Sequence, residues 1–239
     1  MEKNVSAMSV RTFYNIGAWA ALLHFVSMVA IILVEILLGP KPATAEEFFL
    51  IQQNSYLEAL LRGDFLLVFL VGAYLGTFPA LFMALKNINW VAAFFATLFT
   101  TIAVVMTFAN ESTFALLHLG EQFALADNET LRIQLLAAGE AVIAADMWNS
   151  TGGYMSGFLA QGSGVIISLV MLKSKNFGKI TAIAGLAGNA MDLIQHSFYP
   201  FMTEFAKAIH PIMGVFYAVW FIMLARDLFR LTKKTKFNR

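Results

Sequence analysis

The sequence predicts an all-α protein whose helices cross a lipid bilayer as a polytopic bundle. Of its 239 residues, 59% are hydrophobic and only 13% are charged, whereas an ordinary soluble domain carries about 25% charged residues. The mean hydropathy is +0.71, and six apolar stretches are each long enough to cross a hydrocarbon core of about 30 Å. The chain therefore has more apolar surface than one soluble core can bury, and the bilayer is its expected partner.

Each of the six predicted spans contains at most one acidic residue. Glu35 interrupts the first span and Asp192 interrupts the fifth. In lipid every backbone polar group must be satisfied within the protein, and stretches of this length and composition satisfy that condition as helices. The predicted spans are residues 13–38, 65–85, 88–110, 147–172, 180–203 and 208–225.

Two longer segments between spans are also expected to fold. In segment 40–62, Thr44 and Glu47 form a capping-box pattern that follows two prolines. We expect an amphipathic helix on the outer surface of the membrane. Segment 111–146 predicts a helical hairpin around the turn ADNET at 126–130. The apolar residues of the first segment that we expect to face lipid or protein are Phe48, Phe49, Leu57 and Leu60.

Basic residues are distributed unevenly between the two predicted sides of the membrane. With the N-terminus in the cytoplasm, six spans place twelve of the sixteen Lys and Arg residues on the cytoplasmic side. The acidic residues on that side are Glu2 and Asp227. The rest of the chain holds four basic and thirteen acidic residues. An excess of Lys and Arg marks the cytoplasmic side. We therefore expect a single integral domain, 1–239, in the cytoplasmic membrane, with both termini and the tail 230–239 in the cytoplasm.

Small residues recur every four positions in two of the spans. Such ridges let helix backbones approach closely in lipid, where the hydrophobic effect does not drive helix association. We interpret them as packing surfaces within the bundle or in a homo-oligomer, with a glycine-lined substrate path as the alternative. The ridges are Gly72, Gly76, Ala80 and Ala84 in the second span, and Gly152, Ser156, Ala160, Gly164 and Ser168 in the fourth.

Residues 145–192 combine several recognisable features. Trp148 stands at the entrance of a Gly-rich span, the turn MLKSKNFGK follows at 171–179, and the pattern A-x-x-G-x-x-G-N ends at Asn189. Together with the aromatic and basic ending at 220–231, this layout resembles the prokaryotic membrane family known as domain of unknown function 4386, over about the last two thirds of the chain. The resemblance implies a polytopic architecture and no established activity. Many family members carry an Arg and a Glu in the third span; residues 88–109 contain neither, so no role of that pair carries over.

Ionisable side chains inside a membrane are costly, and each needs a partner, water or a function. In this chain they gather toward the outer halves of the spans and in the outer segments. Those near span ends, such as Asp64, can equally serve as helix caps, and His24 on its apolar face is interpreted as a packing residue. Asp192 and His196 are expected on one helix face, four residues apart. The candidate ligand-binding residues are Glu35, Asp64, Glu111, His118, Asp146, Asn149, Asp192, His196 and His210.

Three functions are compatible with this pattern of residues. The first is binding or transport of a small solute, ion or lipid through an outward-facing polar pocket. The second is an accessory or assembly subunit of the membrane. The third is a membrane-embedded hydrolase that uses a divalent metal, although the motifs H-x-x-x-H and H-E-x-x-H are absent from the sequence. The absence of cysteine excludes thiolate ligands, and no basic face indicates nucleic-acid binding. Candidate metal ligands are His118, Asp192, His196 and His210.

Overall fold

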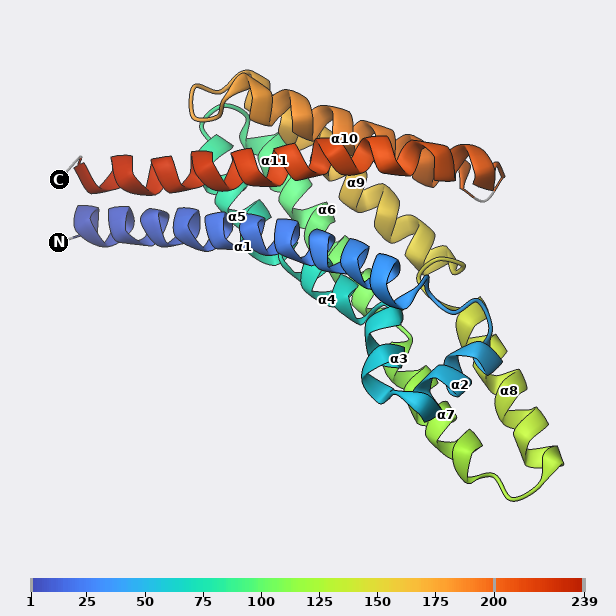
Figure 1. Ribbon diagram of the computed structural model, residues 1–239. Coiled ribbons are helices and arrows are strands. Elements are labelled where there is room, and N and C mark those ends of the chain that lie inside the picture. Colours follow the sequence, from blue (N-terminus) through green and yellow to red (C-terminus); the bar gives the residue numbers. More distant parts are fainter. Residues whose placement is uncertain (1, 200, 238–239) are drawn as a thin grey trace. The chain divides into compact units, whose positions relative to one another are not determined.

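The computed structural model describes residues 2–199 and 201–237, and every regular element in this part of the chain is a helix (Figure 1). The prediction of an all-α fold is confirmed. The helices are α1 (Glu2–Leu38), α2 (Ala45–Asn54), α3 (Tyr56–Arg62), α4 (Phe65–Gly72), α5 (Tyr74–Leu85), α6 (Trp90–Ala109), α7 (Thr113–Leu125), α8 (Glu129–Ala144), α9 (Thr151–Leu172), α10 (Lys179–Phe198) and α11 (Thr203–Phe237).

Five helical stretches of the described residues are long and apolar enough to cross a membrane. They correspond to predicted spans one, two, three, four and six. Helix α10, which covers most of the predicted span at 180–203, is not among them. Its Asn, Asp, Gln and His residues make it less apolar than the others. The five stretches are Ser9–Leu38, Phe65–Leu85, Trp90–Leu125, Thr151–Leu172 and Glu204–Lys234.

The chain forms two compact units, which are described separately below. Unit 1 comprises Met1–Val26, Val71–Val105 and Met155–Arg239, and unit 2 comprises Ser27–Leu70 and Met106–Tyr154. The divisions fall inside helices such as α1 and α6, and linkers do not separate the units. The expectation of a single domain stays a prediction.

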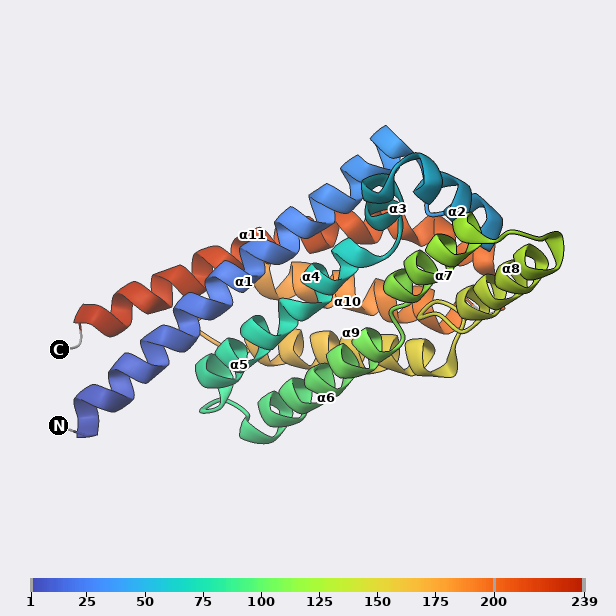
Figure 2. The same cartoon turned by 90° about the horizontal axis from the view of Figure 1, so that it is seen from below.

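Unit 1 is built around helix α11. Helices α10 and α11 lie side by side in both views (Figures 1 and 2). The first part of α1 runs antiparallel to α11, and the ring centroids of Trp19 and Phe229 are 5.5 Å apart. The core of the unit is large and apolar. Its most deeply buried side chains are Phe78, Leu81, Leu85, Ile167, Met171, Trp220, Phe221, Leu224 and Leu228.

Small residues bring α1 and α5 into close contact within unit 1. A Cβ atom at Gly17 would overlap the Cβ of Ala80, and one at Gly76 would lie 2.8 Å from the Cβ of Ala20. Glycine is therefore required for this approach. Gly76 and Ala80 of the small-residue ridge predicted in the second span thus pack against a helix of the same chain.

Unit 2 contains the predicted hairpin, formed by α7 and α8, with α2 packed against both (Figure 1). Asn128 caps α8 by accepting a hydrogen bond from the Leu131 N–H at 2.9 Å. Phe48 and Phe49 of α2 are fully buried in a cluster with residues of α7, so these rings face protein. Leu57, by contrast, is 62% exposed.

The predicted capping box at the start of α2 is present in modified form. Thr44 Oγ1 accepts a hydrogen bond from the Glu47 N–H at 3.2 Å. The returning bond from the Glu47 carboxylate goes to the N–H of Ala43 at 3.0 Å, whereas the ideal box returns it to the capping residue. The single predicted helix is also divided in two, because Ser55 ends α2 and caps α3.

Candidate functional site

Three predicted site residues, Asp64, Asp146 and Asn149, lie together in unit 2 around Lys41. Lys41 Nζ donates to Asp64 Oδ2 at 2.5 Å and to Asp146 Oδ2 at 2.8 Å. Asp146 Oδ1 accepts hydrogen bonds from the backbone N–H groups of Trp148 (2.9 Å) and Asn149 (3.2 Å). Trp148 Nε1 donates to Asp64 at 3.1 Å. We call these five residues the Lys41 cluster.

The single ammonium of Lys41 bridges both carboxylates of the Lys41 cluster, and Asp146 also accepts hydrogen bonds from two backbone N–H groups. The side chain of Asp146 is 3% exposed, that of Asp64 15% and that of Lys41 32%. Burial by itself lowers the pKa of Lys41, but the carboxylates of Asp64 and Asp146 outweigh this effect and raise the pKa above its ordinary value. The cluster joins the segments before α2, before α4 and after α8, so we interpret it as a structural element.

Three further candidates, Glu35, Glu111 and His118, lie at a helix end or on the surface of the chain. Glu111 Oε1 accepts a hydrogen bond from the Thr113 N–H at 2.8 Å, at the start of α7. Glu35 on α1 and His118 on α7 are exposed. Glu111 therefore acts as a local cap, as expected for polar residues at helix ends.

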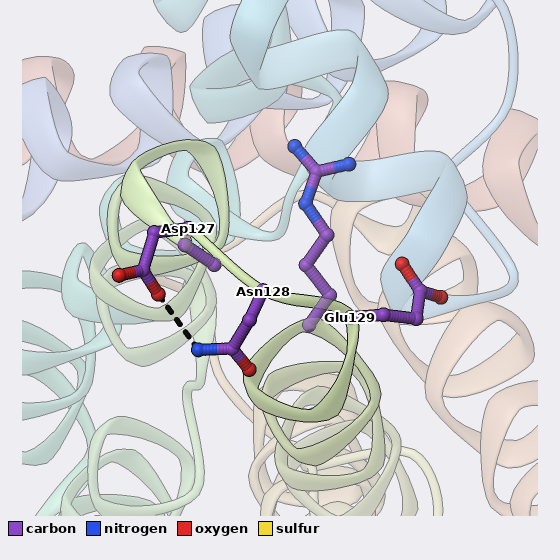
Figure 3. Close-up of a pocket in the computed structure, with 5 residues that line it drawn as sticks. Asp127, Asn128 and Glu129 are labelled. Carbon is purple, nitrogen blue, oxygen red and sulfur yellow. Dashed lines mark hydrogen bonds between the residues drawn. The ribbon is translucent and has the colours of Figure 1, made fainter.

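A hollow at the turn between α7 and α8 is also explained by helix capping (Figure 3). It is lined by residues 126–129 and Arg132. Asn128 Nδ2 donates to Asp127 Oδ1 at 2.7 Å, while its Oδ1 caps α8. The polar atoms of Asn128 are thus used locally, and the hollow shows no set of groups arranged around a ligand.

In unit 1, the structure assembles a polar site around Asp192. Tyr217 of α11 donates its hydroxyl proton to Asp192 Oδ2 at 2.8 Å. The same Tyr217 Oη lies 3.3 Å from Asn189 Oδ1 and 3.4 Å from Gln161 Oε1. A phenol has a single proton to donate, so three acceptor oxygens face one donor. We call Gln161, Asn189, Asp192 and Tyr217 the Tyr217 site.

The orientation of Asn189 is fixed by a second hydrogen bond. Its Nδ2 donates to the backbone oxygen of Gly185 at 2.7 Å, and the residue is buried. Because a carbonyl accepts only from a donor, the amide nitrogen must point toward Gly185 and Oδ1 must point toward Tyr217. In the described part of the chain Asp192 has no ion-pair partner. The site is therefore rich in acceptors.

Glycines of α9 make room for the polar side chains of α10. A Cβ atom at Gly164 would overlap the Asn189 side chain, and one at Gly157 would overlap the imidazole of His196. Gln161 lies between these glycines on the same face of α9, since the three are spaced four and three residues apart. The predicted glycine-rich fourth span therefore packs closely, as interpreted from sequence, against polar side chains of α10.

His24 lies fully buried among aromatic rings of unit 1. Its ring stacks on Phe221, with centroids 4.4 Å apart, and lies 4.2 Å from the ring of Tyr74. This arrangement agrees with the packing role expected from the sequence. However, neither ring nitrogen has a hydrogen-bond partner in the described structure, which is rare for buried polar atoms. Tyr74, which contacts His24, also interacts electrostatically with Asp192 and Tyr217. Tyr74 therefore lies between His24 and the Tyr217 site.

The other histidines of unit 1, His196 and His210, have different neighbours. His210 Nδ1 lies 3.2 Å from Gln195 Nε2, and the His196 ring lies beside Phe158 at 6.3 Å between centroids. No group of three or more His, Asp or Glu residues suited to a metal occurs among the described residues. The divalent-metal hypothesis from His118, Asp192, His196 and His210 stays a prediction from the sequence.

Sequence reasoning missed Lys41, Gln161, Asn189 and Tyr217. It ranked ionisable side chains first and named only Asn149 among the amides, whereas Gln161, Asn189 and Tyr217 are uncharged at neutral pH. Two signals were present. Gln161 and Asn189 are amides inside otherwise apolar stretches, and Lys41 is one of only four basic residues outside the predicted cytoplasmic side.

No family model matches this chain, and neither a curated protein nor a solved structure matches it. The resemblance to domain of unknown function 4386 stays a prediction from the residues quoted above. Function must therefore be argued from the geometry of the site.

Proposed function

We propose that this chain is a six-span protein of the cytoplasmic membrane that binds, and moves across it, a small solute or ion at the Tyr217 site. Both termini lie in the cytoplasm in this proposal, and the site opens to the outer side. Asp192 is thirteen residues beyond Lys179, the start of α10, or about 20 Å along a helix. That distance reaches the outer half of a core about 30 Å thick.

The observation that carries the proposal is the convergence of four oxygen-bearing side chains on one point. Gln161, Asn189, Asp192 and Tyr217 come from three helices, with Oη–O distances of 2.8–3.4 Å. Asp192 has no cationic partner in the described structure. An ionisable residue held inside a membrane bundle marks a path or a binding site by default.

The placement of α10 as the fifth of the six spans is supported by the apolar face opposite its polar one. Ile180, Ile183, Ile194 and Phe198 are exposed in the chain and recur at helical spacing. Asn189 and Asp192 face α11 through Tyr217. A helix with a polar inner face and an apolar outer face suits a bundle that encloses a polar site, even though its average composition is less apolar.

The accessory-subunit alternative loses part of its support. That hypothesis relies on small-residue ridges that join partner helices and on the outer hairpin as a docking surface. Gly76 and Ala80 of one ridge instead pack against α1 of the same chain. Gly157 and Gly164 pack against α10. Binding or transport therefore accounts for more of the observed contacts, because it also uses the excess of acceptors at the Tyr217 site.

The proposal is tested by a stability screen of the detergent-purified protein. Thermal unfolding is measured across inorganic salts, pH values and a library of small polar solutes, for the native protein, Asp192→Asn and Glu121→Gln. Glu121 is an exposed carboxylate on α7 and provides the matched control. We expect at least one condition to stabilise the native protein and Glu121→Gln but not Asp192→Asn, since a ligand stabilises the state that binds it. If no condition separates Asp192→Asn from the control, the proposed function is wrong.

The topology has its own test, because the chain contains no cysteine. Single cysteines replace Asp127, in the turn between α7 and α8, and Lys173, after α9. In intact cells, a membrane-impermeant maleimide is expected to label Asp127→Cys and to leave Lys173→Cys unlabelled until the cells are broken. Labelling of both variants in intact cells, or of neither, would contradict six spans with cytoplasmic termini.

A further inference from the structure

We propose that the ligand of the Tyr217 site is a monovalent cation of the size of Na⁺, coordinated by Tyr217 Oη, Asn189 Oδ1, Gln161 Oε1 and the carboxylate of Asp192. This inference rests on the proposed function and specifies its ligand. It follows from the count of donors, from the spacing of the oxygens and from the charge of the site.

The Tyr217 site has more acceptor oxygens around the Tyr217 hydroxyl than that hydroxyl has protons, so some of its oxygen atoms face one another without a proton between them. The Tyr217 hydroxyl donates to Asp192, its nearest acceptor at 2.8 Å. Asn189 Oδ1, 3.3 Å from Tyr217 Oη, then faces lone pairs, and the bond of its Nδ2 to Gly185 prevents the amide from turning. Gln161 Oε1 lies 3.4 Å from the same hydroxyl oxygen, whose proton is directed to Asp192. A cation resolves this repulsion, because a hydroxyl oxygen keeps two lone pairs for it while donating its proton.

The spacing of the oxygens selects the size of the cation. Ca²⁺, which has nearly the radius of Na⁺, lies about 2.3–2.6 Å from its oxygen ligands, so neighbouring oxygens of an octahedral shell are about 3.3–3.7 Å apart. The distances from Tyr217 Oη to Asn189 Oδ1 and Gln161 Oε1 are 3.3 and 3.4 Å. Mg²⁺, at about 2.0–2.1 Å, requires oxygens about 2.9 Å apart. A larger alkali ion requires a wider shell.

The charge of the site selects a monovalent ion. Asp192 is the single carboxylate of the Tyr217 site, and the other ligands are neutral. One positive charge therefore leaves the site neutral, whereas a divalent ion leaves an uncompensated charge inside the membrane, which is costly. The absence of a three-residue His, Asp or Glu group among the described residues does not conflict with this, because amide and hydroxyl oxygens serve hard cations as ligands.

The experiment titrates NaCl, KCl and N-methyl-D-glucamine chloride at constant ionic strength and pH, and follows thermal unfolding of the detergent-purified protein. The variants are Asp192→Asn, Tyr217→Phe and the control Glu121→Gln. Tyr217→Phe keeps the ring that stacks on Phe221, and gel filtration confirms that each variant is folded. We expect saturable stabilisation by Na⁺, at least tenfold weaker apparent affinity in Tyr217→Phe, loss in Asp192→Asn and no change in the control. Broadening of the ²³Na resonance by the native protein reports Na⁺ binding directly and needs no variant.

The outcomes separate this inference from the proposed function. Equal stabilisation by Na⁺ and K⁺ overturns the selection by size, and an unchanged Na⁺ response in Tyr217→Phe overturns the coordination. A response to pH alone that depends on Asp192 identifies a proton site, which overturns the cation and leaves the proposed function standing. Stabilisation by another solute that is abolished in Asp192→Asn also overturns the cation and leaves the proposed function standing. If no ion, pH or solute acts through Asp192, both proposals fail.

Discussion

Replacing Lys41 by methionine is the sharpest perturbation of unit 2. The substitution keeps the length of the apolar stem and removes the ammonium that bridges Asp64 and Asp146. Two partly buried carboxylates are then left side by side without their cation. Because the pKa of Lys41 is raised in the folded state, its stabilisation is fully present below the unfolded value of about 10.4 and is lost only as the pH rises through the folded one. The variant is therefore compared with the native protein at neutral pH.

The magnitude follows from the exposure of the three side chains. Removing one partner of a buried ion pair costs about 3–5 kcal/mol. Lys41 is 32% exposed, so solvent screens part of the interaction, and Asp146 keeps its backbone donors. We therefore expect a loss of about 2–3 kcal/mol, which corresponds to about a 30- to 150-fold change in an equilibrium constant.

Hydrogen–deuterium exchange measured by mass spectrometry gives a local readout of this loss. The N–H groups of Trp148 and Asn149 donate to Asp146, so their exchange is expected to accelerate in Lys41→Met by up to the factor given above. The double variant Lys41→Met, Asp146→Asn removes one unpaired carboxylate and is expected to recover part of the protection.

The control for this experiment is Lys173→Met, which removes an exposed lysine after α9. Exposed charges contribute little to stability, usually below about 1 kcal/mol. If Lys41→Met changes exchange and the unfolding temperature no more than Lys173→Met does, the Lys41 cluster does not hold unit 2 together and the structural interpretation is refuted.

Three further predictions concern packing and capping. Gly164→Ala places a methyl group against the Asn189 side chain and is expected to destabilise the protein by about 1–3 kcal/mol. Its control, Gly162→Ala, adds a Cβ that meets nothing within 4 Å and is expected to stabilise the helix by up to about 1 kcal/mol. The unfolding temperatures of the two variants are compared in detergent, and equal values would contradict the close packing. Asp227→Asn alters a fully buried carboxylate that accepts two hydrogen bonds at the start of α10. We expect the free energy of unfolding to fall by about 1.5–3 kcal/mol, which lowers the unfolding temperature. An unchanged temperature would argue against the charge-assisted bonds. Thr44→Ala removes the cap of α2 and should cost about 1 kcal/mol, visible as faster exchange of the first-turn amides of α2; unaltered exchange would count against the cap.

Much of the fold follows from local patterns in the sequence. The predicted turn at 126–130 depends on neighbouring residues, and the structure contains it, with Asn128 as the cap of α8. The Thr44 cap is local as well, and only its returning bond shifts by one residue. The division of the predicted helix in segment 40–62 at Ser55 was not predicted, although serine is a known capping residue at helix starts.

The sequence by itself determined the helical class, the apolar stretches of membrane length and the positions of the costly ionisable groups. These are properties of composition and of helical period, which depend on residues close together in the chain. Only the tertiary structure decided that Asp192 joins Tyr217, Asn189 and Gln161, whereas Asp64 and Asp146 are bound to Lys41. Those contacts join residues 23 to 105 positions apart. They are set by how each helix is rotated and packed against others, which the pattern within a single helix does not contain.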